Sequence, residues 1–407
     1  MNEQAAPPSK GAHALRLAVL ATLLGAAAGG LSAVTYLAMI ALQQTIWTPV
    51  GDARWPILPL VLIGGALVGW TRLQAQGPEL EEQLEETRHP NKIQLHMTFW
   101  VAIGAIFAVG FGGAIGPEAG IIAVTAQLSA IVAKHLGKTA ADRRLLVEAG
   151  ISGALSGVYG SPAGGPLHAE AAHKAPKPIL FLAGLAGFLT FISIAQALHS
   201  GSLGMMVMQR YQAEVDIYGI IVAALPALAG ACAGVLYLII RAEVSKRFST
   251  HLPNRFLQPV MAGLGLGLVC TVAPILLFSG HNEIQEMLRL GQEHGALLLV
   301  LLGLGKAVVC AICIAGHWQG GVIFPMCFAG GSMGAATLFI LPGFDPVIGL
   351  AAGMTGASTV GMTRPFVAVL VMLFVLGGGL AAPVFVGALI GWSVLRMMPE
   401  RYVQSAH

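Results

Sequence analysis

Long apolar segments separated by short polar ones dominate the hydropathy pattern of this chain. The first apolar run follows Lys10, His13 and Arg16 and reaches Trp47, and the second extends over about 56–74. From about Gln94 the chain is apolar almost to its end. Polar breaks interrupt it at 134–144, 176–178, 200–216, 241–255, 282–294 and 342–346. Because an apolar run of roughly 20 residues can cross a bilayer as a helix, the pattern predicts an all-α polytopic membrane protein.

Three stretches of the apolar region are too rich in glycine for simple spanning helices: 110–120, 150–165 and 316–331. In hydrocarbon an unpaired backbone group is costly, so a broken helix is tolerated only where it lines a cavity or packs inside protein. Several interrupted segments in one chain therefore favour a transporter or channel whose sites are built from helix ends.

Composition restricts the alternatives. Of the 407 residues, 56% are hydrophobic and 10% are charged, whereas about 25% are charged in soluble domains. This excludes a soluble enzyme and a disordered chain. The formal net charge of +3 is too small to indicate a nucleic-acid partner. The five cysteines lie in apolar runs, so we expect core residues and neither a metal site nor a cofactor.

The second half of the chain repeats part of the first. Ala149–Pro162 resembles Ala352–Pro365 without a gap, at an offset of 203 residues. The glycine-led break Gly116–Gly120 has a counterpart in Gly321–Pro325, at an offset of 205. We therefore predict a duplicated membrane unit. The expected organisation is a flexible tail (1–10), a first repeat (11–199), a linker (200–216) and a second repeat (217–407), with no C-terminal regulatory domain.

Positive charge indicates that the repeats are inverted. Lys10 and Arg16 precede the first helix of the first repeat, whereas the first long helix of the second repeat ends in the basic stretch Arg241–Arg255. Basic residues favour the cytoplasmic side, so the N-terminus is expected there. Inverted repeats bring helix ends from both halves together near the middle of the membrane. The sequence shows no organelle or lipidation signal, so we expect a bacterial inner membrane.

Glu118 is the leading candidate for a functional residue. It is the only Asp, Glu, Lys or Arg between Ile93 and Ala133, and an ionisable group alone in a membrane segment is costly and usually functional. Gly116 and Pro117 precede it, and Pro suits the start of a helix. Glu118 is therefore expected in the first turn of a helix, where free N–H groups attract negative charge. Its carboxylate could compete there with a permeating anion, or it could only cap the helix.

The segment 316–326 is the counterpart in the second half, a glycine break before an apolar helix. The backbone N–H groups of Val322, Ile323 and Phe324 would be its anion donors. Amides supply partial positive charge, which lets an ion bind and still leave. A tight helix crossing that needs small residues is the alternative explanation.

These motifs together resemble the CLC family of chloride channels and proton-coupled chloride antiporters. Gly116-Pro-Glu118-Ala-Gly120 is similar to the family's G-[KR]-E-G-P with its gating glutamate, and Gly320–Met326 is similar to G-G-x-F-x-P-M. Gly150–Pro162 and Gly353–Pro365 resemble the family's small-residue helices, which end in Asn-Ala-Pro and Arg-x-Pro. The resemblance covers most of the chain and suggests a divergent bacterial branch.

The resemblance implies a CLC-like fold of two inverted halves with many broken helices. It implies a pore for a small anion, chloride before others, gated by Glu118 with Gly116 in the anion site. It also implies proton dependence and a homodimer in the lipid bilayer with one pore per subunit. A fluoride exporter or a passive anion channel of the same fold is the alternative.

Departures from the family pattern keep the choice of anion open. Pro117 replaces a basic residue and Gly120 replaces a proline. The family's G-S-G-I-P has its nearest match at 75–78, which makes Gln76 a candidate amide donor. Tyr402 is the candidate for the tyrosine of the central anion site.

Two further sets of residues are candidates for moving charge. Alanines occupy the positions of the family's inner proton-delivering glutamate, which leaves Glu170 and His173 as a candidate proton path. Their side chains would leave a helix in different directions, so the pattern does not support proton coupling. Lys306 is the only Asp, Glu, Lys or Arg between His294 and Asp345. It could raise the potential along the anion path, or it could be a helix-end lysine.

Two rival functions are much less well supported. Gly150-Ile-Ser152-Gly153 matches the G-x-S-G motif of intramembrane serine proteases, but the repeated Gly353-Met-Thr-Gly356 indicates a packing motif. A cation-coupled solute carrier would need an acidic cluster in the membrane, which the apolar segments lack.

Overall fold

The structure, a computed structural model, describes residues 10–75, 95–169, 178–198, 211–341 and 343–404. All regular elements in these segments are helices, and eight of them are long and apolar enough to cross a bilayer. The predicted all-α, multi-pass architecture is confirmed.

The first half contains seven described helices. They are α1 (Lys10–Trp47), α2 (Ile57–Gln74), α4 (Leu95–Gly110), α5 (Glu118–Leu136), α6 (Ala140–Val158), α7 (Gly164–Ala169) and α8 (Pro178–Leu198). The apolar run predicted to reach Trp47 and the one predicted to reach Gln74 end at those residues.

The second half contains the remaining described elements. They are α9 (Ile217–Val222), α10 (Ala224–His251), α11 (Leu257–Val272), η2 (Pro274–Leu276), α12 (Ile284–His294), α13 (Ala296–Ala315), α14 (Ile323–Ile340), α15 (Pro346–Met362), α16 (Pro365–Leu376), η3 (Gly378–Leu380), α17 (Ala381–Met397) and α18 (Glu400–Gln404). The short helices η2 and η3 are 3₁₀ turns.

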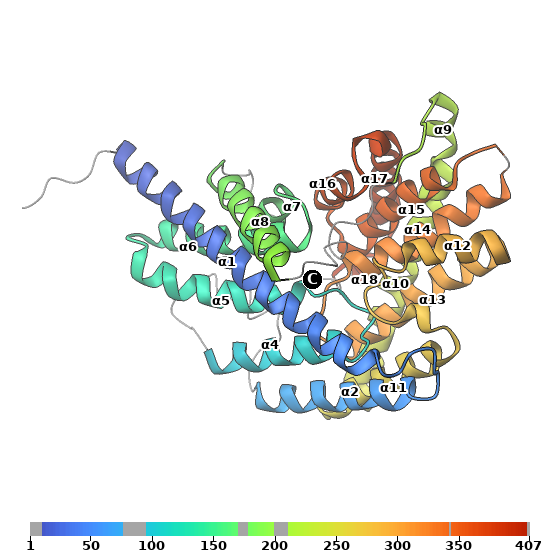
Figure 1. The fold of residues 1–407 in the computed structure, drawn as a ribbon, viewed down its shortest axis with the longest axis horizontal. Helices are drawn as coiled ribbons and strands as arrows, with labels where there is room; N and C mark the ends of the chain where they lie inside the picture. Colours follow the sequence, from blue (N-terminus) through green and yellow to red (C-terminus); the bar gives the residue numbers. More distant parts are fainter. Residues whose placement is uncertain (1–9, 76–94, 170–177, 199–210, 342, 405–407) are drawn as a thin grey trace, which may run out of the picture.

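The two halves use the same packing plan. In the first half α1, α6 and α8 contact one another, and in the second half α10, α15 and α17 do the same. Figure 1 shows most of the first half on one side of the molecule and the second half on the other. α2 is an exception, because it lies beside its counterpart α11, where the halves join.

Glycines set the closeness of these helix contacts. A Cβ on Gly153 of α6 would lie 2.3 Å from the carbonyl oxygen of Gly25 in α1, and a Cβ on Gly187 of α8 would lie 2.3 Å from that of Gly153. Only glycine allows backbones to approach so closely. The equivalent contacts in the second half involve Ala227, Gly356 and Gly391.

Two of the stretches singled out in the sequence take a definite form in the structure. The glycine-rich stretch 150–165 is not one spanning helix, because α6, whose small residues pack against α1 and α8, ends at Val158 and α7 begins at Gly164. The polar stretch 282–294 separates the apolar helices α11 and α13, and most of it forms α12. Arg289 stabilises that helix by pairing with Glu286 and Glu293, three residues before it and four after it.

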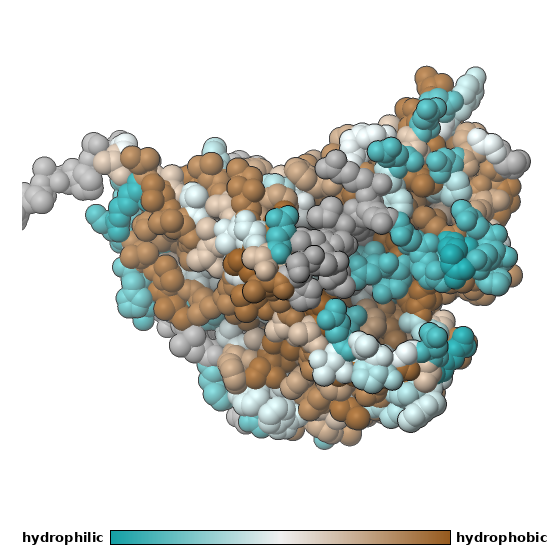
Figure 2. All heavy atoms as spheres, viewed as in Figure 1, coloured by the Kyte–Doolittle hydropathy of each residue, from teal (hydrophilic) through white to brown (hydrophobic). Residues whose placement is uncertain are grey.

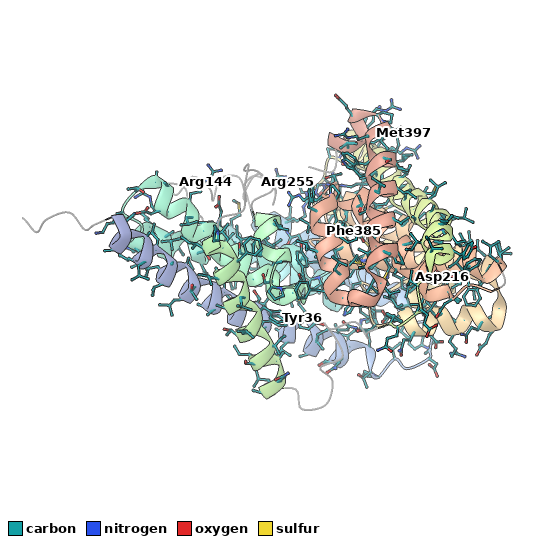
Figure 3. The ribbon with its side chains drawn as sticks, turned by 90° about the horizontal axis from the view of Figure 1, so that it is seen from above. Tyr36, Arg144, Asp216, Arg255, Phe385 and Met397 are labelled. Atoms are coloured by element: carbon teal, nitrogen blue, oxygen red, sulfur yellow. The ribbon has the colours of Figure 1, made fainter. Side chains whose placement is uncertain are left out.

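Charged residues gather at the edges of the molecule. Figure 2 shows a hydrophilic patch over α12 and brown, apolar surface over much of the long helices. In Figure 3, Arg144 and Arg255 lie toward the same edge, and Asp216 lies nearer the opposite one. We call the edge that carries these two arginines the basic face.

Candidate functional site

The two glycine-led breaks meet in space. The N–H of Gly116 donates to the carbonyl oxygen of Gly321 at 2.8 Å, and the N–H of Gly321 donates to that of Gly116 at 2.8 Å. This reciprocal pair is an isolated antiparallel bridge between the halves. α5 begins two residues after Gly116, and α14 begins two residues after Gly321. The structure therefore brings two helix N-termini together deep in the protein.

Glu118 is the first residue of α5 and lies over this glycine pair. Its side chain is 2% exposed, and neither carboxylate oxygen accepts a well-formed hydrogen bond among the described residues, although the backbone N–H groups of Glu118 and Gly321 lie close enough to stabilise its charge. A Cβ on Gly116 would lie 1.9 Å from Glu118 Oε2, and a Cβ on Gly321 would lie 2.0 Å from it. Both glycines are thus needed to make room for the carboxylate. Pro117 is the N-cap of α5, one position earlier than expected.

The burial of Glu118 has a physical consequence. A buried ionised carboxylate without a partner is strongly unfavourable. It can become more stable by taking up a proton, by rotating away, or by gaining hydrogen bonds from the helix start. A change in the protonation, position or hydrogen bonding of the Glu118 carboxyl group would therefore lower its free energy.

The start of α14 offers backbone donors and no charge. Val322 is its N-cap residue and provides no side-chain cap. The amides of Val322, Ile323 and Phe324 donate to no acceptor within the described part of the chain, and Pro325 has no N–H. In α5 the amides of Ala119 and Gly120 are in the same position. Unpaired amides and the helix dipole make such an N-terminus attractive to an anion.

Aromatic and polar side chains surround the two helix starts. The ring of Phe324 faces that of His281, with centroids 5.0 Å apart, and His281 Nδ1 lies 2.6 Å from Ser279 Oγ. Tyr159, the C-cap residue of α6, is 2% exposed and interacts electrostatically with Glu118. The sequence analysis missed both Tyr159 and His281. Tyr159 lies within one of the quoted motifs, but nothing local marks His281.

Lys306 lies in the core and is fully buried, in α13. Its Nζ donates to the carbonyl oxygens of Leu276, Leu277 and Phe278 at 3.0, 3.0 and 2.7 Å. The N–H of Phe278 in turn donates to the carbonyl oxygen of Gly112, in the segment between α4 and α5, at 3.2 Å. Lys306 therefore anchors residues 276–278, and these residues bond to the segment that precedes Glu118. Its effect on an anion remains a prediction.

Of the remaining predicted site residues, Tyr402 alone belongs to the described part of the chain. Tyr402 lies in α18, where its hydroxyl accepts a hydrogen bond from Arg401 at 2.9 Å. Gln76, Glu170 and His173 lie outside the described residues. The predicted roles of these four side chains remain predictions.

The small-residue motif that matched a serine protease is used for packing. Ser152 is fully buried, and its hydroxyl has no hydrogen-bond partner among the described residues. The flanking Gly150 and Gly153 are closed off by Ser129 and Gly25. These contacts explain the motif without a nucleophile.

Comparison with known proteins identifies relatives of the whole arrangement. A sequence profile described as "Voltage gated chloride channel" matches residues 60–396. The chain is 25% identical over 362 residues to "Chloride channel protein CLC-f" of Arabidopsis thaliana, which covers 78% of this chain and 44% of that protein. The chain thus spans less than half the length of this curated relative.

Solved structures show the same fold. A slow cyanobacterial Cl⁻/H⁺ antiporter superposes with a TM-score of 0.77 at 18% identity, covering 96% of this chain and 97% of the other. A CLC-type fluoride/proton antiporter gives 0.74 at 16% identity, covering 95% and 98%. A eukaryotic CLC transporter gives 0.69 at 18% identity, covering 97% and 74%.

Proposed function

The chain belongs to the voltage gated chloride channel family, and from that premise we propose that it carries a small anion across a membrane through the site where α5 and α14 begin. The observation that carries the proposal is the buried Glu118 carboxylate, which accepts no well-formed hydrogen bond from a described residue, beside the Gly116–Gly321 pair. An anion and the carboxylate would take turns at the same amides. Transport would then depend on where the carboxylate is and whether it is protonated.

The proposed gate has two states. With Glu118 ionised and near the helix starts, its negative charge repels an incoming anion. When the carboxyl is protonated or rotates outward, the amides of Val322, Ile323 and Phe324 become available to the ion. Because the donors are amides, the ion binds without being trapped.

Chloride is the proposed ion, and fluoride is the second candidate. The similar structures include antiporters described for each of these anions. Gln76 and Tyr402 are the side chains predicted to contact the central ion, and these roles remain predictions. Selectivity is therefore a question for measurement, as is the choice between a channel and a proton-coupled exchanger.

We further propose that the basic face is cytoplasmic. Arg144 and Arg255 lie toward this face, and Asp216 lies nearer the other (Figure 3). Basic residues concentrate on the cytoplasmic side of membrane proteins. Arg16, near the start of α1, donates to the carbonyl oxygen of Leu136, at the end of α5 just before α6, so the N-terminal end of α1 lies near the start of α6.

A homodimer remains part of the proposal. Exposed apolar side chains on α8, α16 and α17, such as Leu189 at 55%, Phe366 at 80% and Phe385 at 57%, are available to lipid or to a second subunit. Cross-linking in a native membrane would distinguish the two.

The test of the gate is anion flux with Glu118→Gln. Liposomes would be loaded with chloride, fluoride or nitrate, and efflux would be followed between pH 5 and 8 with and without a pH gradient. Gln keeps the size of the side chain and removes its titration, so we expect pH-dependent flux in the parent and pH-independent flux in the variant. Glu286→Gln, on exposed α12, is the matched control.

Two results would contradict the proposal. Absence of anion flux in the parent would remove the transport function. A pH dependence in Glu118→Gln equal to that of the parent would leave transport in place and remove Glu118 from the gate.

A further inference from the structure

The C-terminal ends of α10 and α17 share one apolar cluster, and both carry basic residues. Ile240 is the last residue of α10 in this cluster, which also contains Leu395 and Met398 at the end of α17. α10 continues from there to His251, which is about 16 Å of further helix. α18 follows α17 and also contacts α10. The ends of these three helices therefore form one surface.

This surface belongs to the basic face. In Figure 3, Met397 at the end of α17 lies toward the same edge as Arg144 and Arg255, and Arg255 lies shortly after the end of α10 in the chain. The segments that contain α10 and α17 are both long and apolar enough to cross a bilayer. Their ends on this face are therefore expected at the level of the lipid headgroups.

Four exposed cations occupy the surface, and none of them has an ion pair within the ranges that the structure describes. They are Lys246 and Arg247 of α10, Arg396 of α17 and Arg401 of α18. The carboxylates in the same stretches are Glu243 and Glu400, both exposed. The positive charge is thus in excess, and it favours an anionic partner.

Aromatic rings lie against two of these cations. The central guanidinium carbon of Arg396 lies 4.1 Å from the centroid of the Trp392 ring, and that of Arg401 lies 4.6 Å from the centroid of the Tyr402 ring. Contact with a ring face stabilises a guanidinium group. Its planar fork of N–H donors matches the oxygens of a phosphate group.

Apolar surface adjoins the cations along α17. Phe385, Leu389 and Trp392 are 57%, 61% and 38% exposed. With Arg396 they follow one another at helical spacing, so they line one face of the helix. Along this face, aliphatic and aromatic side chains come first, then a tryptophan and then a cation. A lipid presents its acyl chains, its interfacial region and its phosphate in the same order.

We propose that the ends of α10, α17 and α18 bind the headgroup of an anionic phospholipid in the leaflet at the basic face. Arg396, held over Trp392, would contact the phosphate, and Lys246, Arg247 and Arg401 would supply the surrounding charge. An acyl chain would lie along the exposed face of α17. A soluble anion would use the cations alone, whereas a phospholipid uses both the cations and the apolar face. The site is separate from the proposed anion pathway and does not depend on which ion the chain carries.

Lipid binding to the full chain in detergent is the direct test. Native mass spectrometry would measure the affinity for phosphatidylglycerol, the anionic probe, and for phosphatidylcholine with the same acyl chains. Arg247→Gln with Arg396→Gln is the informative variant, because it removes one exposed cation from α10 and one from α17. Lys134→Gln with Lys138→Gln is the matched control. It changes the net charge equally at two exposed lysines, one in the last turn of α5 and one shortly before α6.

We expect the parent to bind phosphatidylglycerol at least tenfold more tightly than phosphatidylcholine. The Arg247 and Arg396 variant should lose about five- to twentyfold in its affinity for phosphatidylglycerol and nothing in its affinity for phosphatidylcholine. The lysine control should stay within twofold of the parent. Added salt should weaken the preference of the parent for the anionic lipid.

Four results would overturn the proposal. They are equal affinity of the parent for the two lipids, a preference that salt does not weaken, an equal loss in the variant and the lysine control, and no loss in either. A lowered dimer fraction in the variant at unchanged lipid affinity would also overturn it, because the surface would then contact a second subunit. The first two results need no variant, so they decide the matter even if a substitution disturbs folding. Anion flux is not used, so the outcome is separate from that of the transport test.

Discussion

Compared position by position, α5 and α14 start on similar backbone and differ in the charge of their first residue. Each follows a glycine of the reciprocal pair, Gly116 or Gly321, and each lacks a side-chain cap. The first helical residue is Glu118 in α5 and Ile323 in α14. The duplicated backbone thus provides two anion-attracting ends, and the sequence supplies a competing carboxylate at only one of them.

This difference shows how two copies of one backbone motif can have different functions. Two carboxylates at the same place would repel each other and could not both ionise. With no carboxylate, the amides of both helices would attract an anion without an internal competitor. One acidic and one neutral start therefore combine attraction with a means of control.

The largest effect is expected when the asymmetry is removed by Ile323→Glu. The change would bury a second carboxylate at the start of α14, where Ile323 is 3% exposed, and burying an unpaired charge costs several kcal/mol. We expect anion flux at pH 7.5 to fall more than tenfold, with partial recovery at low pH as carboxyl groups are protonated. Ile323→Gln, which has the same size without the charge, should retain far more flux. Equal flux in the two variants would argue against the charge explanation.

A methyl group added at Gly321, in the second half, should displace the Glu118 side chain of the first half. In Gly321→Ala the new Cβ would lie 2.0 Å from Glu118 Oε2, so the carboxylate must move. We expect the pH dependence of flux to be lost, as in Glu118→Gln, and adding Glu118→Gln to have little further effect.

Gly320→Ala is the control for this prediction. Its Cβ would meet the side chain of Ile115 at 2.4 Å, away from the carboxylate. If both alanine variants change the pH dependence equally, the effect is a general distortion of the loop and not displacement of Glu118.

Lys306 offers a smaller, structural contrast between the halves, since the corresponding part of α4 carries no charge. Lys306→Met removes the donor of three buried carbonyl bonds. The free energy of unfolding in detergent should fall by about 1–3 kcal/mol, and Lys306→Arg should restore part of it. An unchanged stability together with a raised half-saturating anion concentration would instead support the electrostatic role predicted from sequence.

The smallest effect concerns two aspartates at equivalent helix starts, Asp142 of α6 and Asp345 of α15. Burial raises the pKa of Asp142, but hydrogen bonds from Thr139 and the charge of His13 outweigh it, and the net pKa is lowered. A lowered carboxyl pKa stabilises the fold above the unfolded value, near 3.9, and this stability is lost as pH falls through the folded value.

At pH 7 we therefore expect Asp142→Asn to lower the free energy of unfolding by about 1 kcal/mol, with the difference shrinking below about pH 4. Asp345→Asn should change it by only a few tenths, because Asn also caps a helix well. Thermal unfolding in detergent at both pH values measures this. A larger loss of stability from Asp345→Asn than from Asp142→Asn would contradict the predicted difference between the two aspartates.

The sequence predicted the parts of the site that depend on local pattern. Glycine and proline before an apolar run indicated that Glu118 begins a helix, and the repeat indicated where its partner segment lies. The family resemblance drawn from those motifs is confirmed by the profile match.

The hydropathy pattern and the local motifs could not predict contacts between segments that lie far apart in the sequence. Nothing near His281 indicates that its ring will meet Phe324, 43 positions further along the chain. Likewise, a lone lysine in an apolar run does not reveal that three carbonyl oxygens 28 to 30 residues earlier will surround it. The stretch 282–294 was predicted only as a polar interruption of the apolar pattern, and the ion pairs that accompany its helix, such as Arg289 with Glu293, are not visible in a hydropathy pattern.

The bond pair between Gly116 and Gly321 also fixes the order of events during biosynthesis. The two residues are made 205 codons apart, so the ribosome must finish and release the later segment into the bilayer before the earlier one finds its match. Until then the start of the newly made α5, with Glu118, lacks its contact with the second half of the chain. A chain stopped after α8 would consequently hold the bundle of α1, α6 and α8 without the bridge between Gly116 and Gly321.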